Sequence, residues 1–123
     1  MTRRTLLLLA LVLPAAALPA CGGGEPPTPA RDGKVAVALD DFRFRPQAIR
    51  AGPGKLRFEL VNRGRLAHTF RLTRRGRDIA KVPSMLPGER ATTSVRLRAG
   101  EYRYLCALSN HEELGMHGTL VVP

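Results

Sequence analysis

Three side chains that can bind a metal ion lie close together near the C-terminal end of this 123-residue chain. They are the thiol of Cys106, the imidazole of His111 and the thioether of Met116, separated by equal intervals of five residues. A thiolate and an imidazole suit zinc or copper, and a thioether shifts the preference toward copper, which accepts soft ligands. The segment from 106 to 116 therefore predicts a copper-binding loop.

A second imidazole lies upstream at His68, after the turn at Asn62–Gly64. Two imidazoles and a thiolate in a trigonal plane, with a distant axial methionine, form the electron-transfer type of copper site. Taken singly, each of these side chains has an ordinary structural role, so the prediction rests on their coincidence. The predicted metal ligands are His68, Cys106, His111 and Met116.

These ligands must be positioned by strands, because the sequence after residue 34 alternates apolar and polar side chains with a period of two. Val35, Val37 and Leu39 illustrate the pattern, and Gly- or Pro-containing turns separate the runs. No segment shows the period of an amphipathic helix. The expected strands are 34–43, 46–50, 55–62, 67–73, 77–81, 90–97, 101–106 and 117–122. Short strands with regular turns predict an all-β sandwich.

Residues 100–122, GEYRYLCALSNHEELGMHGTLVV, resemble the C-terminal copper loop of the cupredoxins, the family of plastocyanin, azurin and auracyanin. The segment from Asn62 to His68, NRGRLAH, is also loosely similar to that family. The resemblance implies a Greek-key β-sandwich of seven to eight strands that holds one type 1 copper ion. It implies a strong bond from Cys106, a weak axial bond from Met116 and one-electron transfer.

Two positions depart from the family pattern. Family members often have Asn after the first His ligand and Ser or Thr after the Cys, and these two residues stiffen the site by hydrogen bonding. Here the positions hold Thr69 and Ala107. Because Ala107 has no polar side chain, the sequence predicts that this link is absent or different.

The N-terminus has the features of a secretory signal over 1–20. A cationic start with Arg3 and Arg4 precedes an apolar run of about 14 residues, which is shorter than the roughly 20 of a spanning helix. The sequence Leu18-Pro-Ala-Cys21 resembles the lipobox of bacterial lipoproteins, in which the Cys becomes the acylated N-terminus. A twin-arginine signal is the second interpretation.

Residues 21–33 are expected to be the lipidated Cys21 and a flexible Gly/Pro linker, leaving one domain over 34–123. Acylation of Cys21 would leave Cys106 without a partner, which favours occupation of its thiol by a metal. A disulfide between the two cysteines is the competing interpretation, and it would exclude lipidation.

The chain carries 20 basic against 10 acidic side chains, a formal net charge of +10. Nucleic acid is not expected as a partner outside the cytoplasm, so the charge is either a solvated surface or steering toward an acidic redox protein. The predicted partners are redox proteins and, through the lipid, the extracytoplasmic face of the cell membrane; a monomer is expected. An apolar docking collar is hypothesised from Leu66, Leu86, Leu108 and Leu114.

An electron carrier is the predicted function, and a copper storage or delivery module with the same ligands is the alternative. A metal-free sandwich that keeps only the fold is a further possibility. A copper oxidase or nitrite reductase needs a second copper site with several more histidines, whereas this chain has three in all. The sequence therefore predicts that the protein is not an enzyme.

Overall fold

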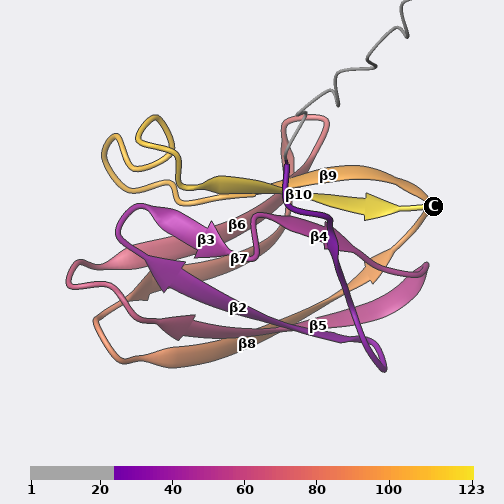
Figure 1. Cartoon of the computed structure of the whole chain (residues 1–123), viewed down its shortest axis with the longest axis horizontal. Coiled ribbons are helices and arrows are strands. Elements are labelled where there is room, and N and C mark those ends of the chain that lie inside the picture. Colours follow the sequence, from indigo (N-terminus) through magenta and orange to yellow (C-terminus); the bar gives the residue numbers. More distant parts are fainter. Residues whose placement is uncertain (1–23) are drawn as a thin grey trace, which may run out of the picture.

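The computed structural model describes residues 24–123, which form two β-sheets packed face to face and contain no helix (Figure 1). The six-stranded sheet has the order β1 (Thr28–Pro29), β4 (Ala48–Arg50), β10 (His117–Val122), β9 (Gly100–Leu105), β6 (His68–Arg74), β7 (Arg77–Met85). The four-stranded sheet has the order β3 (Arg43–Arg45), β2 (Lys34–Asp40), β5 (Gly54–Asn62), β8 (Arg90–Leu97). The predicted all-β sandwich is confirmed, and the Greek-key arrangement is consistent with this strand order.

The chain crosses repeatedly between the two sheets, so strands that are distant in sequence become neighbours. β2 and β5 pair in parallel, as do β4 and β10, whereas β6 pairs antiparallel with both β7 and β9. Because β6 and β9 run in opposite directions, the first residue of β6 lies near the residue that follows β9. This pairing brings His68 and Cys106 to the same end of one sheet.

The sandwich interior is filled by the apolar residues of the period-two pattern. Four aromatic side chains, Phe44, Phe58, Phe70 and Tyr104, are completely buried and contact one another with ring centroids 5.0–6.0 Å apart. Burial of one such side chain contributes about 1.5–3 kcal/mol. The Tyr104 hydroxyl donates a hydrogen bond to the Pro46 carbonyl at 2.7 Å, and burial raises its pKa above the ordinary value. Loops therefore extend from a rigid, fully packed body.

The strand predicted over 34–43 is two strands joined by a turn. β2 ends at Asp40, β3 begins at Arg43, and the two pair as an antiparallel hairpin. The prediction is wrong at this end of the strand. The Asp41 side chain accepts hydrogen bonds from the backbone N–H groups of Arg65 and Leu66, and the chain turns here instead of continuing as a strand. The loops after β2, β5, β7 and β9 gather at one end of the sandwich (left in Figure 1).

The ordered domain begins earlier than the predicted boundary at residue 34. β1 pairs in parallel with β4, the Ala30 N–H donates to the Arg50 carbonyl at 2.8 Å, and Arg31 forms a bridge with Lys34. Part of the predicted 21–33 linker is thus an edge strand of the larger sheet. This strand and the division of 34–43 into two strands account for the ten strands observed, against the eight predicted. The predicted signal over 1–20 and the predicted lipidation site Cys21 lie outside the described residues. Within 24–123, no helix is long and apolar enough to cross a membrane.

Candidate metal centre

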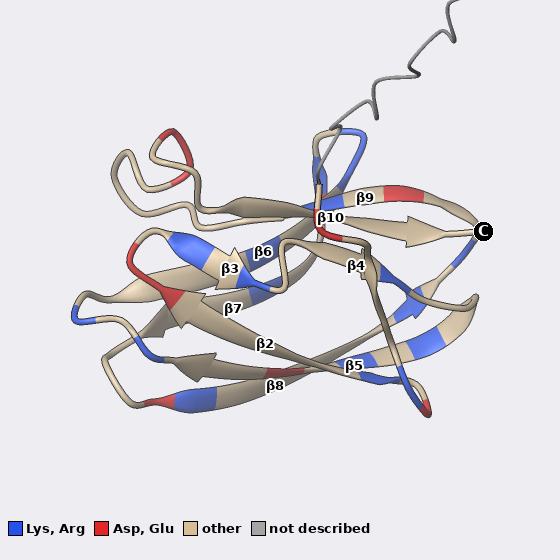
Figure 2. Cartoon of the chain, viewed as in Figure 1, with Lys and Arg blue, Asp and Glu red and all other residues tan. Residues whose placement is uncertain are grey.

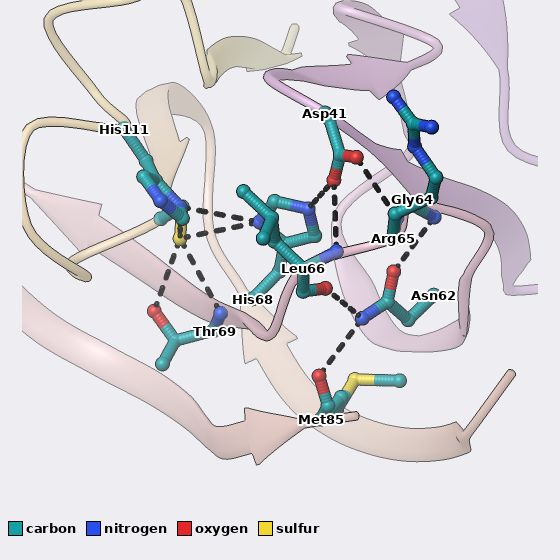
Figure 3. Close-up of polar contacts among 10 residues, drawn as sticks. Asp41, Asn62, Gly64, Arg65, Leu66, His68, Thr69, Met85 and His111 are labelled. Atoms are coloured by element: carbon teal, nitrogen blue, oxygen red, sulfur yellow. Dashed lines mark hydrogen bonds and ion pairs between the residues drawn. The ribbon is translucent and has the colours of Figure 1, made fainter. Parts of the chain in front are cut away.

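Three of the four predicted ligands meet at the loop end of the sandwich. The Nδ1 atoms of His68 and His111 lie 3.3 Å apart, and the Cys106 Sγ lies 4.0 Å from the first and 3.6 Å from the second (Figure 3). The three donor atoms all fall within 4.8 Å of one another. His68 comes from the first residue of β6, Cys106 from the residue after β9, and His111 from the following loop.

Burial affects the protonation of His111 within this cluster. His68 and Cys106 are fully buried, Cys106 is a free thiol, and His111 keeps 9% of its surface exposed. Desolvation lowers the pKa of His111, and the neighbouring His68 lowers it further. Both effects favour the neutral imidazole, which is the form that binds a metal ion.

Met116 is buried beside the cluster and is held by the backbone of the same loop. Its N–H donates to the His111 carbonyl at 3.0 Å, and its carbonyl accepts from the Cys106 N–H at 3.1 Å. The side chain is fully buried in the hydrophobic core. The loop therefore closes on itself and keeps the backbones of Cys106, His111 and Met116 close together.

Asp41 contacts the cluster from outside, and the sequence analysis did not identify it. Its Oδ1 lies 2.7 Å from the Nε2 of His68, and its Oδ2 accepts the Arg65 N–H at 2.8 Å. The Arg65 N–H and then the His68 hydrogen bond lower the pKa of Asp41, so the group is an ionised acceptor. The adjacent polar pair Asp40-Asp41, which interrupts the alternation, was the available signal for a turn here.

Phe42, the next residue of that turn, packs against the other histidine. Its ring centroid lies 4.7 Å from that of His111 in an edge-to-face arrangement and 6.3 Å from that of His68. A two-residue turn therefore contacts both imidazoles, one through a carboxylate and one through an aromatic ring.

Thr69 provides the link that the sequence analysis expected to be absent or different. Its hydroxyl accepts a hydrogen bond from the Ala107 N–H at 2.8 Å, and its own N–H donates to the Cys106 Sγ at 3.4 Å. The link is different in kind, since it uses the backbone of Ala107 and needs no polar side chain there. An N–H donated to the sulfur stabilises the thiolate that a metal requires.

The chemistry of these donors fits a copper ion. Two imidazole nitrogens and a cysteine sulfur converge on one point, and the second nitrogen of His68 is already occupied by Asp41. Nitrogen and thiolate ligands in a trigonal set are typical of electron-transfer copper sites. Every buried side-chain nitrogen and oxygen of the described residues has a hydrogen-bond partner, and the partners of the two Nδ1 atoms are members of the cluster itself.

The sequence matches the family described as "Cupredoxin-like domain" over residues 5–122. The chain belongs to the cupredoxin-like family. The resemblance stated from residues 62–68 and 100–122 is therefore confirmed. No curated protein matches the sequence of this cupredoxin.

Solved structures show the same fold at low sequence identity. A reduced auracyanin from the photosynthetic bacterium Roseiflexus castenholzii matches with a TM-score of 0.68 and 16% identity, covering 76% of this chain and 98% of its own. Auracyanin A of Chloroflexus aurantiacus, a "blue" copper protein, matches with a TM-score of 0.65 and 17% identity, covering 78% and 100%. A multicopper oxidase matches with a TM-score of 0.58 and 18% identity, covering 72% of this chain and 41% of that protein.

Family and geometry together identify the cofactor as copper of the type 1 class. His68, Cys106 and His111 are arranged as its site. The copper, when bound, supplies the one-electron redox chemistry, and the protein supplies the ligands and holds them in position.

Proposed function

We propose that this cupredoxin is a one-electron carrier anchored by lipid on the extracytoplasmic face of the cell membrane. The observation that carries the proposal is the assembly of three ligand atoms within 4.8 Å of one another. The Asp41 carboxylate accepts a hydrogen bond from His68 on one side, and the Thr69 N–H donates one to Cys106 on the other. A site held in this way changes little between oxidation states. Small rearrangement favours fast electron transfer over metal release.

Visible spectroscopy of the protein titrated with Cu(II) tests this function. An intense thiolate-to-copper band and reversible one-electron voltammetry support the carrier. A colourless protein that binds only Cu(I) supports copper delivery instead, and absence of copper uptake contradicts both. Oxidase chemistry has little support, because the described residues contain one cluster of three or more potential ligands and the chain has three histidines.

Met116 completes the proposed ligand set as a weak axial donor. Its burial and its backbone bonds to Cys106 and His111 support this role. Met85 is a matched control, since it is also buried at this end of the sandwich and pairs with His68 in the sheet. Met116→Leu should change the reduction potential and the visible spectrum, because the axial ligand tunes both. Met85→Leu should change neither; equal effects of the two variants would contradict the assignment.

Electrons should leave through His111, the one ligand of the three-donor cluster with exposed surface. Leu66, Leu86 and Leu114 are 45%, 58% and 53% exposed on loops at this end, whereas Leu108 is half-buried against the core. An apolar surface allows the close, short-lived contact that electron transfer needs. The proposed docking collar therefore consists of Leu66, Leu86 and Leu114, without Leu108.

Leu114→Glu tests this collar. A buried charge at the contact should slow electron exchange about tenfold, equivalent to about 1.4 kcal/mol, without changing the copper spectrum. Ile79→Glu is the control, because Ile79 is 38% exposed on β7 outside the loop end. Equal rates for Leu114→Glu and the wild type would exclude the collar.

Membrane anchoring is proposed from Cys21 and the apolar run before it. The full chain, expressed in a bacterium with lipoprotein-processing enzymes, should fractionate with membranes and carry a lipid on Cys21. Cys21→Ser should release it as a soluble extracytoplasmic protein that still binds copper. Unmodified Cys21 in the mature wild-type protein would contradict the anchor.

The positive charge supports an acidic redox partner. Basic residues are spread over the strands and the β6–β7 hairpin, while acidic residues mark the β2–β3 turn and the loop after β9 (Figure 2). The exchange rate with an acidic partner should fall as salt rises, because screening weakens steering. An exchange rate that does not change with salt would contradict steering toward an acidic partner and leave the positive charge as a solvated surface.

A further inference from the structure

The carboxylate of Asp41 is bound on both oxygens by groups of the copper end. Oδ1 lies 2.7 Å from the Nε2 of His68 and 3.4 Å from the Leu66 N–H, and Oδ2 lies 2.8 Å from the Arg65 N–H (Figure 3). Both backbone groups are donors. The carboxylate therefore acts as an acceptor toward His68 as well.

An acceptor at Nε2 determines which nitrogen of His68 carries the proton. Nε2 must be protonated to donate to Asp41, so Nδ1 keeps its lone pair in the neutral ring. Nδ1 is the atom that faces the Nδ1 of His111 and the Sγ of Cys106. Asp41 thus selects the tautomer that presents a free donor atom to the metal position.

The loop at 62–66 packs closely against the Asp41–His68 pair. A Cβ at Gly64 would overlap Oδ1 of Asp41 and lie 2.8 Å from Nε2 of His68, so only glycine fits. Asn62 holds the loop: its Oδ1 accepts the Gly64 N–H, and its Nδ2 donates to the carbonyls of Leu66 and Met85, each at 2.8 Å. The Asp41 side chain keeps 22% exposure, and its partner His68 keeps none.

We propose that Asp41 is the positioning residue of the copper centre, fixing His68 for coordination through Nδ1 and stabilising oxidised over reduced copper with its negative charge. The inference rests on the proposed electron-carrier function and deepens it. Cu(II) carries one more positive charge than Cu(I), so a carboxylate one hydrogen bond behind a ligand favours the oxidised ion. The same hydrogen bond makes the imidazole a stronger donor, which acts in the same direction. Asp41 therefore lowers the reduction potential.

A purely structural role for Asp41, holding the loop at 64–66, is the alternative, and a matched pair of charge-removing variants separates the two. Asp41→Asn keeps the side-chain shape and removes the charge. Asp40→Asn removes the same charge one residue away, where the carboxylate pairs with Arg45 at 2.6 Å and does not contact the site. Reduction potentials, visible spectra and affinities for redox-inactive zinc are measured for both variants and the wild type.

Asp41→Asn should raise the ratio of Cu(I) to Cu(II) affinity at least about tenfold relative to Asp40→Asn, which corresponds to about 59 mV for one electron. Zinc affinity should fall about 10–100-fold in Asp41→Asn alone, the usual effect of losing an outer-shell partner. Equal reduction potentials and equal zinc affinities in the two variants would overturn the role of Asp41. The carrier function would still stand in that case if the wild type is blue and shows reversible one-electron voltammetry. A wild type that takes up no copper would overturn both.

A measurement on the unaltered protein keeps the proposal testable if Asp41→Asn fails to fold. Nitrogen NMR of the metal-free wild type should show His68 protonated at Nε2 and unprotonated at Nδ1. The opposite tautomer would overturn the positioning role.

Discussion

The two histidines of the copper site come from regions of opposite construction. His68 begins a strand, is fully buried, and has its outer nitrogen bound to the carboxylate of Asp41. His111 lies on an irregular loop and is 9% exposed; its backbone bonds to Leu108 and Met116, and an aromatic ring contacts its imidazole. The strand side fixes the metal position, and the loop side brings one ligand to the surface.

This difference shows how one small domain can combine a buried, hydrogen-bonded ligand with a ligand that reaches the surface. Strand pairing and the hydrogen bond to Asp41 hold His68, because motion would expose or unpair a buried polar group. His111 is held by backbone hydrogen bonds within its loop and by packing against an aromatic ring. These contacts leave part of its imidazole exposed to solvent. A rigid anchor and an accessible ligand are thus separate tasks of separate segments.

The largest expected effect is at Cys106, which both regions share. Cys106→Ser should abolish the thiolate-to-copper band, because the hydroxyl neither binds copper comparably nor supplies the charge transfer. Titration with Cu(II) followed by visible spectroscopy measures this. Cys21→Ser is the control and should be as blue as the wild type. A colourless wild type together with a blue Cys21→Ser would support a Cys21–Cys106 disulfide instead, because removing Cys21 would free the Cys106 thiol.

Replacing each histidine with glycine sharpens the comparison directly. Both variants should lose copper affinity about 100-fold or more, beyond the 10–100-fold of an outer-shell partner. Added imidazole should restore the colour of His111→Gly, whose cavity reaches the surface, and should restore His68→Gly far less. The spectra with increasing imidazole measure this, and equal rescue would show that burial does not distinguish the two ligands.

Asn62→Ala tests how far the strand side depends on its loop. The buried amide makes three hydrogen bonds, and its loss should lower the free energy of unfolding by about 2–3 kcal/mol. Asn110→Ala, an exposed position on the copper loop, should cost less than about 0.5 kcal/mol. Denaturant unfolding of the metal-free proteins measures both, and similar losses would remove the asymmetry between the regions.

The smallest expected effect is at Thr69, where the two regions are joined. Thr69→Val keeps the shape but removes the acceptor of the Ala107 N–H, and should cost about 1 kcal/mol of unfolding free energy or less, since water can reach Ala107. Thr69→Ser keeps the hydroxyl and should be close to the wild type. A Val variant as stable as the wild type would show that the link does not hold the loop.

Much of the fold follows from local sequence pattern. Strands with period-two alternation, such as 55–62 and 90–97, agree with the structure within a residue or two because one face of each is less exposed than the other. β7 is one exception, since it continues to Met85 beyond the predicted 77–81. The other exceptions lie where the alternation ends. Residues 28–29 have no alternation to mark them as a strand, and Asp41 and Phe42 leave the ladder for contacts with distant loops.

The sequence by itself determined the all-β class and the copper-binding character of His68, Cys106 and His111. It also predicted Met116 as a fourth ligand and lipidation at Cys21, since these predictions depend on residue types and spacing alone. Only the tertiary structure decided what surrounds the metal position. Asp41 is 27 residues from His68, and Thr69 is 38 residues from Ala107, so neither contact has a local signature. Both depend on which strands become neighbours when the sheets pack, and this is a property of the whole chain.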